Sequence, residues 1–169
     1  MREITYDVRG FLTVRRDSVR VPLRGSLALR ADPDSGRFTG DLALRPATVR
    51  RMALGMTVVS AIVEITPGSP VTGRIDAGQL FATVTVDAVI AAVRVAGRTA
   101  GGSGSCRTAA HAVVPLRSRP GFRLEQGGRL AARYQRPPFT GCGWLTPLIN
   151  LMAAGPGNAV VIDLLPVTR

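Results

Sequence analysis

Few side chains in this sequence could do chemistry: there is a single histidine, there are two cysteines, and lysine is absent. His111 is the side chain whose unperturbed pKa would lie closest to neutrality. It stands between alanines in a segment with strand character and has no evident partner, which is typical of an ordinary strand residue. Without lysine, Schiff-base chemistry and a phosphate-binding P-loop are excluded. The sequence therefore predicts no catalytic residue and no cofactor.

The cysteines, Cys106 and Cys142, lie far apart in the sequence and do not form a CxxC pair. With His111 they are too few for a four-ligand zinc site, so no metal site is expected. The spacing favours a structural disulfide over two buried free thiols. Closing a loop of this length would stabilise the fold by about 3–4 kcal/mol in the chain-entropy model. A disulfide in turn indicates an oxidising compartment.

The elements that must position these residues follow a period of two, which is the signature of half-buried strands. Val19, Val21 and Leu23 alternate with arginines and a proline, so one face of this strand is expected to be buried and the other exposed to solvent. Gly10 is expected to form a bulge, and Pro22 indicates an edge position or a bulge. Strands are expected over about nine segments: 4–14, 19–30, 38–44, 52–65, 71–76, 80–95, 106–116, 129–135 and 159–165.

One short helix is expected near residues 146–153, with Thr146 as the N-cap and Pro147 at the first helical position. Turn-forming residues at 32–36 and 77–79 separate the strands. A chain of 169 residues is close to the common size of one domain. The sequence thus predicts a single β domain over residues 1–169, an all-β antiparallel sandwich or barrel with one short helix.

The formal net charge is +11, and all 22 basic residues are arginine. This preference matches GC-rich codons, so genome composition explains much of it. Nucleic acid is an unlikely partner because a single-strand platform needs aromatics interleaved with arginine, and those are few and scattered. An anionic envelope polymer or membrane surface is the alternative partner. That hypothesis requires five arginines to share one surface: Arg20, Arg24, Arg30, Arg50 and Arg51.

Between residues 52 and 65 both alternating faces are apolar, so this segment is either covered on both sides or faces an interior cavity. The helix candidate is similarly apolar and could plug one end of the β structure. If these surfaces line a pocket, a lipid or another apolar small molecule is the expected ligand. The candidate ligand-binding residues are Met56, Val58, Ile62, Trp144, Ile149 and Met152.

Five strings resemble those of a family of uncharacterised exported β-rich proteins of actinobacteria: CRTA at 106–109, GGRL at 127–130, PPFTGCG at 137–143, LTPLINL at 145–151 and GPGN at 155–158. In that family the paired cysteines sit in the same strings. The resemblance implies a β fold, the disulfide, and an extracellular or cell-envelope location reached with a leader that this chain lacks. It implies no activity.

Three functions remain open at this point. The leading one is a non-enzymatic exported domain of the cell envelope that binds an apolar small molecule. The second is a cofactor-free enzyme acting on a hydrophobic substrate by positioning alone, which requires Tyr134, His111 or Glu64 to face a ligand-sized void. The third is the arginine-mediated binding of an anionic surface. Oligomeric state and ligand identity are not encoded in any of these patterns.

Overall fold

A computed structural model describes residues 1–14, 19–53, 56–101 and 105–168. Within these ranges the chain forms thirteen strands, a 3-10 turn η1 and one short helix α1, so the all-β prediction is confirmed. The bounds are β1 Arg2–Val14, β2 Val19–Ala31, β3 Arg37–Leu44, β4 Ala47–Ala53, β5 Met56–Pro67, β6 Val71–Asp76, β7 Gln79–Val95, β8 Arg98–Gly101, β9 Cys106–Thr108, β10 Ala112–Ser118, β11 Gly128–Arg136, β12 Phe139–Thr140, η1 Gly143–Leu145, α1 Thr146–Ala153 and β13 Gly155–Pro166.

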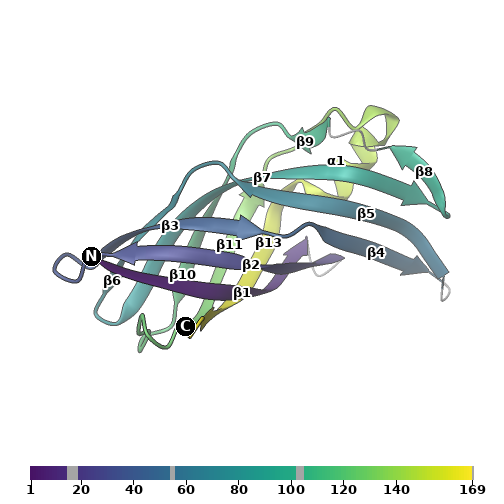
Figure 1. The fold of residues 1–169 in the computed structure, drawn as a ribbon. Helices are drawn as coiled ribbons and strands as arrows, with labels where there is room; N and C mark the ends of the chain where they lie inside the picture. Colours follow the sequence, from purple (N-terminus) through teal and green to yellow (C-terminus); the bar gives the residue numbers. More distant parts are fainter. Residues whose placement is uncertain (15–18, 54–55, 102–104, 169) are drawn as a thin grey trace.

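Of the two architectures expected, the chain adopts the barrel (Figure 1). Eight strands of the described chain follow one another in the order β10, β11, β13, β1, β2, β3, β6 and β7, and β7 pairs with β10 to close the ring. Every pairing is antiparallel. Closure leaves no free sheet edge around the ring, and the inward-facing half of each strand forms the core.

β7 is long enough to belong to two regions of the barrel. Its first part pairs with β6 and β10, whereas its second part pairs with β5 on one side and with β8 and β9 on the other. The register of β7 with β5 slips at Ala91, which has no partner on β5. In Figure 1 the hairpin of β4 and β5 and the end of β7 reach beyond the ends of β1 and β2. The barrel therefore has a short closed end and a longer, more open end.

Three local expectations are corrected or refined. The segment from 52 to 65 is not one strand, because β4 ends at Ala53 and β5 begins at Met56. Gly10 forms no bulge: the register of β1 with both neighbours is continuous through it. A Cβ at Gly10 would overlap the carbonyl oxygen of Val161, so the glycine permits close approach of β13. Pro22 lies at an edge as expected, because the pairing of β2 with β3 stops at Gly25.

The closed end of the barrel is filled by side chains. Tyr6, Leu29, Leu80 and Leu164 are all at most 1% exposed and belong to one continuous apolar cluster. The Tyr6 hydroxyl donates a hydrogen bond of 2.5 Å to the carbonyl oxygen of Leu124, which satisfies the polar end of this buried ring. A second, smaller cluster lies at the other end, around the disulfide and α1.

Candidate ligand pocket

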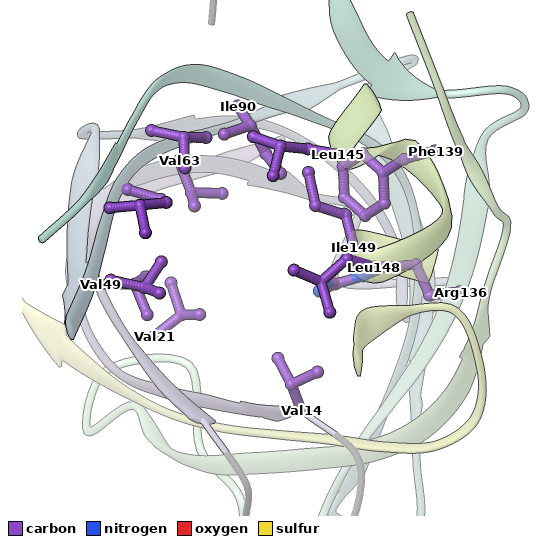
Figure 2. Close-up of a pocket in the computed structure, with 14 residues that line it drawn as sticks. Val14, Val21, Val49, Val63, Ile90, Arg136, Phe139, Leu145, Leu148 and Ile149 are labelled. Carbon is purple, nitrogen blue, oxygen red and sulfur yellow. The ribbon is translucent and has the colours of Figure 1, made fainter. Parts of the chain in front are cut away.

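The open end of the barrel contains a cavity of about 150 Å³ (Figure 2). Strands β1, β2, β4, β5 and β7 form one side of its wall, and the segment from Arg136 to α1 forms the other. Fourteen residues of the described chain line it, and all of these except Arg136 are apolar. They are Val14, Val21, Val49, Val59, Ala61, Val63, Ile90, Val93, Val95, Arg136, Phe139, Leu145, Leu148 and Ile149.

Strand alternation explains the apolar wall. On β5, Val59, Ala61 and Val63 face the cavity, while Ile62 between them is 41% exposed on the outside. β-branched residues dominate because they pack well on a pleated surface. Their side chains are short, so the end of the barrel that they line is left hollow.

A cap made from residues 137–154 covers the side where the strand wall stops. β10 begins at Ala112 and β11 ends at Arg136, so no strand of the main ring continues there. α1 is held to β12 by Asn150, whose Oδ1 accepts a hydrogen bond from the Phe139 amide at 2.6 Å and whose Nδ2 donates to the Phe139 carbonyl at 3.1 Å. This pair of bonds imitates a strand pairing and fixes how the helix faces the cavity.

The predicted disulfide between Cys106 and Cys142 is formed, and it fastens the start of the cap to β9. The helix begins at Thr146 as expected, but Leu145 rather than Thr146 is its N-cap. The Thr146 hydroxyl instead donates to the Gly143 carbonyl at 2.9 Å and accepts from the Cys142 amide at 3.2 Å. Helix α1 is thus hydrogen-bonded to the preceding part of the cap at Thr146 and again at Asn150.

Arg136 is the polar exception in the pocket wall, and it is only 7% exposed. Its Nη2 donates a hydrogen bond of 2.7 Å to the Tyr134 hydroxyl. None of the ion pairs found in the described chain includes Arg136. Figure 2 shows its guanidinium directed from the wall toward the cavity beside Ile149. A charge buried without a counter-ion is costly, so this placement needs a reason.

Tyr134 precedes Arg136 by two residues on β11 and therefore faces the same interior. It lines a second cavity of about 50 Å³, one layer deeper in the barrel, where Leu12 and Leu23 replace Val14 and Val21 as wall residues. Burial raises the pKa of Tyr134. The positive charge of Arg136 and its hydrogen bond to the hydroxyl lower this pKa, but by less than burial raises it. Tyr134 is consequently a neutral phenol at physiological pH, and its hydroxyl retains a proton that it can donate.

The structure places only some of the predicted ligand-binding residues at the cavity. Ile149 lines the cavity. Ile62 does not, because it points out of the barrel, and Trp144 does not, because it is 74% exposed on the cap. The side chains of Met56, Val58 and Met152 lie outside the described residues. Sequence reasoning missed Arg136, although the alternation Leu130, Ala132, Tyr134, Arg136 could have placed it inside the barrel.

The groups required by the enzyme alternative do not meet in the cavity. His111 lies on the surface, where its Nδ1 is 2.8 Å from Oδ1 of Asp87. Glu64 is exposed on β5. Tyr134 alone reaches an interior void, the deeper one. Among the described residues, no group of three or more His, Cys, Asp or Glu side chains could hold a metal ion.

Fold and site together define the class: a closed eight-stranded antiparallel β-barrel with an apolar pocket under a helical cap. Comparison with protein-family models, with curated proteins and with solved structures finds no significant match. Within the described chain, no helix is both long enough and apolar enough to cross a membrane.

Proposed function

We propose that this chain is a non-enzymatic exported domain of the cell envelope that binds a lipid or another apolar small molecule at the capped end of its barrel. The observation that carries the proposal is the cavity of about 150 Å³ with thirteen apolar side chains among its fourteen lining residues. A dry apolar cavity of similar volume in an engineered protein binds benzene. This pocket therefore suits a ring or a short acyl segment.

An exported location is supported by the disulfide between Cys106 and Cys142, because such bonds persist in oxidising compartments. The resemblance of the cysteine-containing strings to exported actinobacterial proteins points the same way. A route for the ligand is offered by α1, because Leu148 lines the cavity and is also 50% exposed. Trp144 and Leu151 extend the apolar surface outside that entrance.

Native mass spectrometry of the purified protein tests the proposal, and a co-purified apolar compound is the expected result. Ala61→Phe should abolish or strongly reduce this ligand, because the ring would occupy the cavity that Ala61 lines. Ser60→Phe is the matched control, since residue 60 is adjacent on β5 but belongs to the opposite face. An unliganded wild type that also binds no added alkyl or aromatic probe would overturn the proposal.

One observation favours a second function, the binding of an anionic polymer. Arg37, Arg74 and Arg117 are brought onto one row of the outer wall by the register of β3, β6, β7 and β10. Phe81 completes the row, with the guanidinium carbons of Arg74 and Arg117 each 5.8 Å from its ring centroid. None of these arginines takes part in the ion pairs of the described residues.

The arginines named from the sequence are less concentrated. Arg20, Arg24 and Arg30 are spread along the outer face of β2, and Arg30 is paired with Glu3. The side chain of Arg51 lies outside the described residues. The anionic-polymer proposal predicts that binding to heparin weakens steeply with salt and is reduced in the double variant Arg74→Gln, Arg117→Gln, with Arg133→Gln as control. Equal binding by these variants would remove it.

A further inference from the structure

The buried arginine in the pocket wall carries an inference about the ligand, which rests on the proposed function. Arg136 is 7% exposed and carries a guanidinium group, and the other described residues that line the cavity are apolar. An arginine whose only task was to hold Tyr134 would place an uncompensated charge beside that cavity, where the desolvation cost is greatest. A ligand that brings a negative charge would remove this cost.

We propose that the natural ligand is an apolar acid whose single carboxylate is bound in the pocket by Arg136, a residue that Tyr134 holds in place from the deeper layer of the barrel. The planar guanidinium offers paired N–H donors that match the two oxygens of a carboxylate. Nη2 donates to the Tyr134 hydroxyl at 2.7 Å, so Tyr134 fixes the orientation of the guanidinium and leaves its other N–H groups for the ligand.

The charge of the site also limits the ligand class. Among the described residues that line the cavity, Arg136 is the one that carries a charge, so these residues balance one negative charge and would leave a second one buried. A monoanionic carboxylate therefore fits better than a phosphate monoester dianion. The body of the acid would lie against the valine side chains of β4 and β5, and a tail that exceeds about 150 Å³ would leave past the half-exposed Leu148.

Three probes that share one alkyl chain test this inference: octanoate, 1-octanol and octylammonium, each titrated into the full chain by isothermal calorimetry at neutral pH. We expect octanoate to bind about 10- to 100-fold more tightly than octanol, the range of a charge-assisted hydrogen bond. Octylammonium should bind most weakly. Arg136→Met should abolish the preference for octanoate over octanol. Arg136→Lys, which keeps the charge but loses the paired donors, should retain part of the preference.

The outcomes separate this inference from the proposed function. Equal affinities of the wild type for octanoate and octanol would overturn the inference and leave an apolar pocket in place. Failure to bind any probe would overturn both. If Arg136→Met does not fold, the wild type still decides the question: octanoate affinity should fall as the pH is lowered through the carboxyl pKa of the ligand, about 4 to 5, whereas octanol affinity should not. Parallel pH profiles for the two probes would contradict the inference.

Discussion

The two ends of the barrel are built from the same strands and yet differ in how they are filled. At the closed end, long side chains such as Tyr6, Leu80 and Leu164 meet in the middle and are at most 1% exposed. At the capped end, the same alternation places valines on the inner face, and they enclose a cavity of about 150 Å³. One end of the barrel is a packed core, and the other end encloses a cavity.

The difference comes from closure as well as from side-chain size. At the closed end, β7 and β10 complete the ring with backbone hydrogen bonds. At the capped end, β7 turns to other partners, β11 stops at Arg136, and residues 137–154 cover the wall in place of a strand. The cap is joined to β9 and the segment after it by the disulfide, by the pairing of β12 with β9 and by the hydrogen bond from the Ala109 amide to the Pro138 carbonyl, and none of these bonds belongs to the ring. The packed core and the proposed binding pocket thereby lie at opposite ends of the barrel.

A matched pair of leucines provides the most direct test of this comparison. Leu164→Ala at the closed end should lower the free energy of unfolding by about 3–5 kcal/mol, because it leaves a void in a packed core. Leu148→Ala should cost less than about 1 kcal/mol, because Leu148 is 50% exposed and already borders a cavity. Urea denaturation of both variants measures this. Similar losses would mean that the two ends are equally packed.

Removal of the disulfide should weaken the cap selectively. The double variant Cys106→Ala, Cys142→Ala should lower the free energy of unfolding by about 3 kcal/mol, since the crosslink closes a loop of 36 residues. Hydrogen exchange should rise most in residues 137–154 and least in β1 and β2. Uniformly faster exchange along the chain would show that the cap is not an independent unit.

The closed end should respond to alkali through Tyr6. Burial, and then the charge of Glu125, raise the pKa of Tyr6 from 10.0 to about 12. Because the unfolded phenol ionises first, the stabilising contribution of the neutral hydroxyl is complete below pH 10 and is lost as the pH rises to about 12. We expect a loss of up to about 2 kcal/mol over that interval in urea titrations. Tyr6→Phe should flatten the profile, and an unchanged profile would contradict the assignment.

The smallest effect is expected from the bond pair that holds α1. Asn150→Ala leaves the Phe139 amide and carbonyl without their side-chain partner and should cost about 1–2 kcal/mol. The matched variant Asn150→Asp keeps the acceptor toward the Phe139 amide and loses the donor, so it should cost less. Ligand affinity should fall in the same order. Full retention of affinity in Asn150→Ala would show that the helix does not need this attachment to shape the pocket.

Local patterns in the sequence predicted much of this fold. The alternation of β2, the turn at 77–79, the short helix and the cysteine pairing were all confirmed. The hairpin of β4 and β5 was missed because the apolar pattern that begins at Met52 continues past the end of β4 at Ala53 into β5, and no strong turn signal divides the two strands. The choice between sandwich and barrel depends on the pairing of β7 with β10, a long-range contact that no local period encodes.

The site was harder to predict than the fold. Large apolar residues were expected to line it, but Trp144 is exposed on the cap and Ile62 faces outward, while small valines form the wall. A cavity forms where side chains are too short to meet, so the largest apolar residues in a sequence are a poor predictor of the residues that line it. Arg136 was passed over because charge usually marks a surface. The alternation along β11 points this position inward, and the cap covers the end of the strand there.

The close contacts at two glycines of the barrel wall have a consequence for recognising distant relatives. A Cβ at Gly10 would overlap the carbonyl oxygen of Val161, and one at Gly25 would overlap that of Ala43. A related protein with the same strand packing is therefore expected to have glycine at both positions, even where the residues of the proposed pocket differ. We expect these two glycines to be conserved among distant relatives more strongly than the residues of the proposed pocket.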